Sequence, residues 1–217
     1  METGFSGLLT ATVFLPAVGA VFILLLVRGD RNIRVVAVMV AVADLVLTLL
    51  VFGLFSHGED AARFQFIDQF TWIPGETLRA NYLLGVDGLS APLVALTGIL
   101  GLCAVLASWR IDTRVREHFV WLLVLQTAVM GVFSSLDLLL FFFFWELELV
   151  PMYMLISIWG TGRKEYSAMK FLMFTILGSA FMLVAIVAVF LTPDVGTFDM
   201  RPFPPKGPCW GPGYCCL

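Results

Sequence analysis

Two glutamates, Glu146 and Glu148, lie in the middle of the apolar segment 136–159. A run of about 20 mostly apolar residues is long enough to cross the hydrocarbon core of a bilayer, so both carboxyl groups are expected near its midplane. Ionisable groups are rare at that depth, and they commonly mark ion or proton pathways. The spacing therefore predicts a proton-transfer site on a membrane helix.

The insertion energy of this segment supports a site that faces protein or water. Thirteen Leu, Ile, Phe or Val residues between 138 and 158 favour insertion by about 4 to 8 kcal/mol, and two central acids cost about 5 to 7 kcal/mol. At about 100° per residue the two glutamates are roughly 200° apart, so one path cannot use both. We therefore predict that one of the two glutamates, Glu146 or Glu148, is the proton relay. Pro151 frees the carbonyl of Leu147, which can hold water.

Two further charged residues lie within apolar runs. Asp44 is central to an earlier run and has no basic residue nearby in the sequence. Lys170 is close to one end of the last run, where it is expected to anchor the helix at the membrane surface first and to serve as a possible relay second. Asp87 is predicted to cap the helix that follows it.

No metal site is predicted. The four cysteines form no C-x-x-C pair, and neither His57 nor His118 has a partner at ligand spacing. The few charges form no basic stripe, which argues against nucleic-acid binding.

The elements that carry these residues are predicted to be membrane helices. The chain has 217 residues, of which 60% are hydrophobic and 13% charged, a composition typical of a membrane protein. We predict an all-α polytopic bundle over residues 1–192 with an outer loop over 56–88, in which residues 64–72 alternate as in a β-hairpin. A disordered tail rich in Pro, Gly and Cys is expected over 193–217. The six predicted spans are 7–27, 35–55, 89–109, 119–133, 138–158 and 168–191.

The basic residues predict the orientation of the bundle. Nine of the thirteen Lys and Arg residues fall on one side of the predicted spans and four on the other. By the positive-inside rule the richer side faces the cytoplasm or its equivalent, and the N-terminus faces outside.

The segment 141–160, FFFFWELELVPMYMLISIWG, closely resembles the fifth transmembrane helix of chain 4, or subunit M, of proton-pumping NAD(P)H-quinone oxidoreductase (complex I), in its NdhD-like form. Segment 81–98 is similar to the entry to the third helix of that family, and segment 166–183 to its sixth. The resemblance extends from about the N-terminus to Met200.

The resemblance implies an antiporter-like membrane subunit that moves protons and carries no cofactor itself. NAD(P)H, flavin, iron–sulfur clusters and quinone are then expected in other subunits, and other complex I membrane subunits are the expected partners. The family's proton-path glutamate directly follows a tryptophan, and Glu146 matches that position, so the resemblance implies that Glu146 is the proton relay. Glu148 matches the second acid of the family's WELEL variant and is expected to be a secondary site. The implied location is the bacterial cytoplasmic membrane, or a thylakoid or organellar inner membrane.

The resemblance also implies more helices than this chain contains, including a seventh that carries the lysine paired with the relay glutamate. We therefore expect a truncated form that follows the family to the sixth helix and is not competent alone. Two alternatives are a subunit of a multisubunit sodium/proton antiporter and a structural membrane protein without transport, in which the glutamates only mediate packing.

Overall fold

Six long helices and one β-hairpin make up the structure, a computed structural model that describes residues 7–55, 64–73, 80–191 and 198–199. Every helix is long and apolar enough to cross a membrane, because 18 residues span about 27 Å. The predicted all-α membrane bundle with six spans is thus confirmed. The elements are α1 (Leu8–Leu25), α2 (Asp30–Leu54), β1 (Gln65–Ile73), β2 (Ala80–Val86), α3 (Ser90–Ala107), the short 3-10 helix η1 (Ser108–Arg110), α4 (Val115–Ser134), α5 (Leu138–Trp159) and α6 (Lys164–Phe190).

Three helices begin earlier than the predicted apolar runs. Helix α2 begins at Asp30, five residues before its predicted start, and helices α4 and α6 begin at Val115 and Lys164, four residues before theirs. Charged residues in these first turns end a hydropathy run, but they do not interrupt the backbone hydrogen bonds of a helix.

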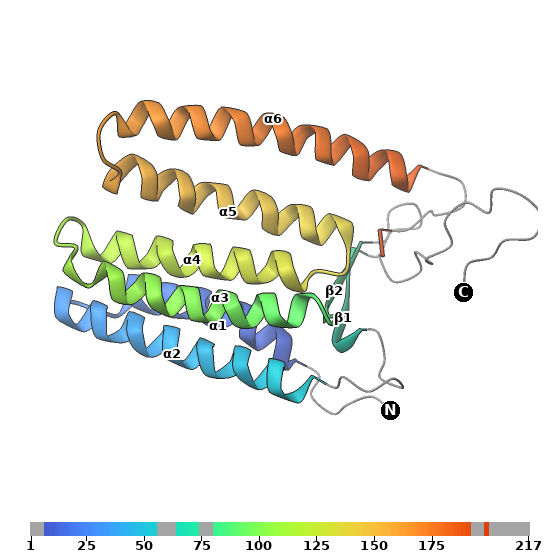
Figure 1. Cartoon of the computed structure of the whole chain (residues 1–217), viewed down its shortest axis with the longest axis horizontal. Helices are drawn as coiled ribbons and strands as arrows, with labels where there is room; N and C mark the ends of the chain where they lie inside the picture. The colour runs from blue at the N-terminus through green and yellow to red at the C-terminus, as the bar shows by residue number, and fades with distance from the viewer. Residues whose placement is uncertain (1–6, 56–63, 74–79, 192–197, 200–217) are drawn as a thin grey trace, which may run out of the picture.

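The six long helices lie side by side (Figure 1). Helix α1 packs on α2 and α4, and α3 packs on α2 and α4, so the first four helices form a cluster. Helix α5 packs on α4, and α6 packs on α5. The bundle therefore grows outward from α4 through α5 to α6.

The β-hairpin covers one end of the bundle. Strands β1 and β2 pair antiparallel, with Asp68 opposite Leu84 and Phe70 opposite Tyr82. The side chains of Leu83 and Leu84 are fully buried. The predicted β-hairpin is confirmed, and we call this end of the bundle the hairpin end.

Three aspartates cap helices at the hairpin end. Asp87 accepts hydrogen bonds from the backbone N–H groups of Leu89 and Ser90, as predicted, and Asp137 does the same at the start of α5. Asp68, on β1, caps α1 from a remote position, because its carboxylate accepts from the backbone and the hydroxyl of Thr10. A carboxylate is favourable at a helix N-terminus because it accepts hydrogen bonds from the unpaired N–H groups and lies at the positive end of the helix dipole.

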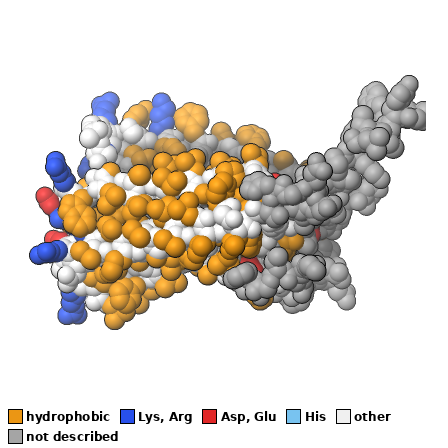
Figure 2. All heavy atoms as spheres, turned by 60° about the horizontal axis from the view of Figure 1, so that its bottom comes forward, with side chains coloured by type: hydrophobic (Ala, Val, Ile, Leu, Met, Phe, Trp, Pro, Cys, Tyr) orange, Lys and Arg blue, Asp and Glu red, His pale blue; other side chains and the backbone are white. Residues whose placement is uncertain are grey.

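Basic side chains gather at the opposite end, which we call the basic end (Figure 2). There Arg116 donates to the carbonyl of Val27 at 3.0 Å, and Lys164 donates to the carbonyl of Ile158 at 2.7 Å. Cations that meet helix C-termini complement the dipole.

Of the predicted tail, only residues 198–199 belong to the described part. The backbone N–H of Leu138 donates to the carbonyl of Phe198, whose ring stacks on Phe190 at 4.3 Å. The rest of the tail prediction lies outside the described residues.

Candidate functional site

The two predicted glutamates lie at the middle of α5. Glu146 is the ninth and Glu148 the eleventh of its 22 residues, and both are half-buried. Within the part of the chain that the structure describes, neither carboxyl group has a hydrogen bond or an ion pair. Helix α5 continues unbroken past Pro151, which is buried.

Glu148 lies on the side of α5 that faces α4. The Phe144 ring is 2% exposed and packs against Gly131 of α4 so closely that a Cβ on Gly131 would overlap it. Four residues after Phe144 the helix has turned by about 400°, so Glu148 follows it on nearly the same stripe, one turn farther from the hairpin end.

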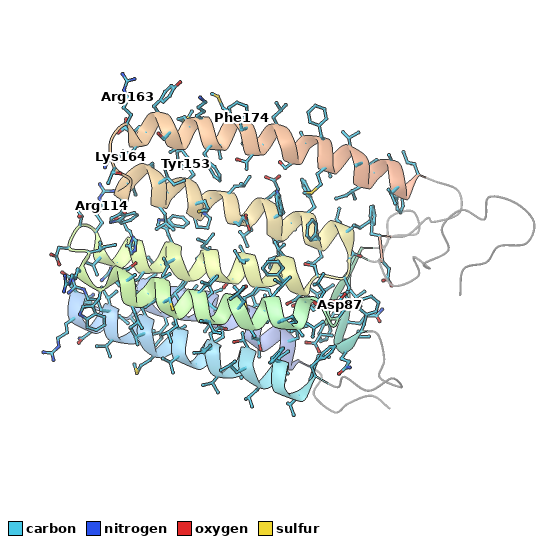
Figure 3. The ribbon with its side chains drawn as sticks, in the orientation of Figure 1. Asp87, Arg114, Tyr153, Arg163, Lys164 and Phe174 are labelled. Atoms are coloured by element: carbon cyan, nitrogen blue, oxygen red, sulfur yellow. The ribbon has the colours of Figure 1, made fainter. Side chains whose placement is uncertain are left out.

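Glu146 lies on the side of α5 that faces α6. The hydroxyl of Tyr153 donates to the sulfur of Met169 on α6 at 3.8 Å, and Figure 3 shows Tyr153 between the two helices. Seven residues separate Glu146 from Tyr153, which leaves them within about 20° of each other around α5. The two glutamates therefore serve different interfaces.

Lys170 is not brought to Glu146. It follows Met169 on α6 and is exposed, so it lies near the level of Tyr153, about 10 Å from Glu146 along the helix axes. Among the described residues no ion pair joins the two. The roles predicted for Glu146, Glu148 and Lys170 remain predictions.

A third carboxyl group, Asp44, has a partner that sequence reasoning missed. Asp44 is fully buried in α2, and Nε2 of Gln126 on α4 donates to its Oδ2 at 2.6 Å. Gly101 of α3 lies against the Gln126 amide, where a Cβ would overlap it. Gln126 was overlooked because it stands in an otherwise apolar run, and its polarity alone was the available signal.

Metal ligands do not gather in the described ranges, where no three His, Cys, Asp or Glu side chains form a group. His118 instead approaches the Ser108 hydroxyl at 3.0 Å and the Trp159 ring at 4.8 Å. His57 and the three cysteines of the tail lie outside the described residues.

Sequence comparisons match this region and most of the chain. Residues 135–200, which include α5 and α6, match the family model described as "NADH:quinone oxidoreductase/Mrp antiporter, TM". NAD(P)H-quinone oxidoreductase chain 4-2 of Synechocystis is 41% identical over 193 residues, 88% of this chain and 34% of the relative. The chloroplastic chain 4 of Chlorokybus atmophyticus is 40% identical over 171 residues, 79% of this chain and 33% of the relative.

The fold is also found in a solved respiratory complex. A chain of respiratory complex I from Thermus thermophilus with bound NADH matches with a TM-score of 0.74 and 26% identity, over 88% of this chain and 38% of that chain. This chain spans about a third of the length of the curated relatives that it matches. Over that shared part, it is homologous to the chain 4 membrane subunits of NAD(P)H-quinone oxidoreductase, as the sequence of α5 predicted.

Proposed function

We propose that this chain is a membrane subunit of a proton-translocating NAD(P)H-quinone oxidoreductase, and that Glu146 is a proton-carrying group. The observation that carries the proposal is the place of Glu146: a mid-membrane carboxyl group on the α6-facing side of α5, without a cation nearby in the described structure. The homology of the chain to chain 4 subunits connects this carboxyl group to a quinone oxidoreductase.

The chemistry follows from the cost of charge inside a membrane. A carboxylate without a partner is costly at this depth, and an approaching cation or water molecule lowers that cost. A proton taken up from one side and released toward the other is then moved across the hydrophobic barrier. The family resemblance assigns the approaching cation to a lysine on a further helix.

The exposed face of α6 supports contact with further helices or lipid. Helix α6 packs mainly on α5, and Phe174 points away from the bundle (Figure 3). The exposed large apolar side chains of α6 include Met173, Phe174, Leu177, Phe181 and Val184. Such a surface is stable next to acyl chains or membrane subunits but not next to water.

The proposal extends to the surroundings of the chain. Its partners are other membrane subunits of the complex, and NAD(P)H, flavin, iron–sulfur clusters and quinone are bound by other subunits. The membrane is the bacterial cytoplasmic membrane, or a thylakoid or organellar inner membrane, with the basic end inside and the N-terminus outside. The distribution of Lys and Arg supports this orientation.

The matching family description also names Mrp antiporters, but the relatives described above are quinone oxidoreductase chains, which favours the first function. Co-purification tests it: complex I subunits should accompany the tagged chain from membranes. Antiporter subunits in their place would contradict it.

A pumping assay tests the role of Glu146. In vesicles that contain the complex, Glu146→Gln should abolish most of the NAD(P)H-driven proton uptake, because an amide cannot release a proton. Glu165→Gln, on the exposed first turn of α6, is the matched control and should leave uptake unchanged. Normal uptake by the Glu146→Gln complex would show that this carboxyl group only has a structural role.

A further inference from the structure

Asp44 and Gln126, which are hydrogen-bonded to each other, and Thr127, the next residue on α4, each carry a buried polar atom without a partner in the described structure. These atoms are Oδ1 of Asp44 on α2, and Oε1 of Gln126 and Oγ1 of Thr127 on α4. Their residues are 0%, 5% and 3% exposed, and within the described structure none of the three atoms has a hydrogen-bond partner. Buried polar atoms are nearly always paired, and each unpaired one costs about 1 to 3 kcal/mol. This region is therefore suited to bind water and a proton.

The charged and titratable groups around Asp44 also favour a bound proton. Arg31 and Arg34 lie in the first turns of α2, about 15 Å or more along the helix from Asp44. Cys103 on α3 is exposed, and His118 on α4 lies eight residues before Gln126. Among the described residues of α1 to α4, every Lys and Arg lies at the basic end. A buried carboxylate without a cation is costly, so Asp44 is stable as the acid.

The partner of Asp44 is held in place by close packing. Gly101 leaves room on α3 for the Gln126 amide, whose Nε2 already donates to Oδ2 of Asp44. This donor fixes the amide so that Oε1, its acceptor, remains free. An acidic hydrogen on Oδ1 of Asp44 therefore has an acceptor available, either the amide or a water molecule.

Helix α4 connects this region to α5. The contact between Gly131 and Phe144 sets the register of the two antiparallel helices. One turn toward the basic end, Thr127 comes four residues before Gly131, and Glu148 comes four residues after Phe144. Thr127 and Glu148 therefore occupy the same turn of facing stripes, while the neighbouring Gln126 faces α2 and α3.

We propose that Asp44, Gln126 and Thr127 form a hydrated proton-binding site that exchanges protons with Glu148 across the interface of α4 and α5. The O–H bond of Asp44 breaks as its proton moves to water, and an O–H bond forms on Glu148 as the water or the Thr127 hydroxyl passes a proton on. Asp44 becomes the carboxylate and Glu148 the acid, with no change in oxidation state. The site does not depend on the role proposed for Glu146.

Infrared titration of the chain in lipid nanodiscs tests the site. A protonated carboxyl band should shift when aspartate is labelled with ¹³C at its side-chain carboxyl, and Asp44→Asn should remove that band. Asp30→Asn, at the exposed start of α2, should leave it. Gln126→Leu should move the band to higher frequency, because the carboxyl group loses a hydrogen bond. The presence of a protonated aspartate band is measured on the labelled wild-type chain, so this part of the test does not require a stable variant.

Exchange of this carboxyl proton with D₂O tests the connection to Glu148. Thr127→Val should slow exchange by roughly tenfold, which corresponds to about 1.4 kcal/mol on the barrier. Thr97→Val is the control, because the Thr97 hydroxyl already donates to the carbonyl of Leu93.

An aspartate band that is absent in the wild type, or that persists in Asp44→Asn, would overturn the site. Unchanged exchange in Thr127→Val would overturn the connection. If the band disappears when sodium replaces choline in the buffer, the site binds a sodium ion and the proposal of a proton site is wrong.

Discussion

The capping of α1 by Asp68 predicts a large loss of stability when Asp68 is replaced. Asp68 is 2% exposed and accepts three hydrogen bonds from the start of α1. The donors are the backbone N–H of Gly7 at 2.6 Å, the backbone N–H of Thr10 at 3.0 Å and the Thr10 hydroxyl at 2.8 Å. We expect Asp68→Ala to destabilise the chain far more than an exposed substitution on the same strand.

The magnitude follows from these contacts. Losing an N-cap carboxylate costs about 0.5 to 2 kcal/mol, and a partly buried donor left without an acceptor costs about 1 to 3 kcal/mol. Because the three bonds share one carboxylate, their costs are not additive. We expect a loss of about 2 to 4 kcal/mol for Asp68→Ala. Asp68→Asn keeps one acceptor oxygen and should lose about half as much.

The free energy of unfolding can be measured by titrating the chain in mixed micelles with sodium dodecyl sulfate, following helix content and tryptophan fluorescence. Gln69→Ala is the matched control, because Gln69 is exposed and adjacent on β1, and it should stay within about 0.5 kcal/mol of the wild type. A double-mutant cycle with Thr10→Val should show coupling, since Thr10 uses the same carboxylate. An Asp68→Ala loss no larger than that of Gln69→Ala would refute the capping argument.

Two further predictions concern the hairpin and the interface of α4 and α5. Burial raises the pKa of the Tyr82 phenol, as does the nearby Asp68 carboxylate, while its hydrogen bond to Thr10 lowers it. The stabilisation from neutral Tyr82 is therefore present below its ordinary pKa of 10.0 and is lost as pH rises through the folded-state pKa. The difference in ultraviolet titration between the wild type and Tyr82→Phe should show a phenol that ionises above pH 10.0. A difference centred near pH 10.0 would contradict this. Gly131→Ala should destabilise the chain by about 1 to 3 kcal/mol in the same unfolding assay, because its Cβ would overlap the Phe144 ring. Gly178→Ala, with open space around it on α6, should cost nothing, and equal effects at both glycines would argue against the packing explanation.

The sequence predicted features that depend on local pattern. Long apolar runs identified the six helices, alternation within 64–72 identified a strand of the hairpin, and spacing identified the Asp87 cap. In each case the evidence lies within one element or turn. The angle of about 200° between Glu146 and Glu148 also follows from helix geometry alone.

Features that join distant segments could not be predicted in this way. Asp68 lies 58 residues from Thr10, and Asp44 lies 82 residues from Gln126. Their pairing depends on which helices pack together and at what rotation. Similarly, the side of α5 that faces α4 became known only from the contact between Phe144 and Gly131.

The two faces of α5 differ in a way that separates the roles of its glutamates. Helix α4 is more buried than any of the other five long helices. Glu148 therefore faces a closely packed helix whose register is fixed by the contact between Gly131 and Phe144, which suits exchange through fixed side chains. Glu146 faces α6, where the Tyr153 hydroxyl donates to the Met169 sulfur at 3.8 Å. Sulfur is a weak acceptor, so a small shift of α6 lets water or a cation approach at low cost. A gating motion that controls proton release should thus occur between α5 and α6. A cross-link between cysteines placed on α5 and α6 should then block pumping, whereas one between α4 and α5 should leave it intact.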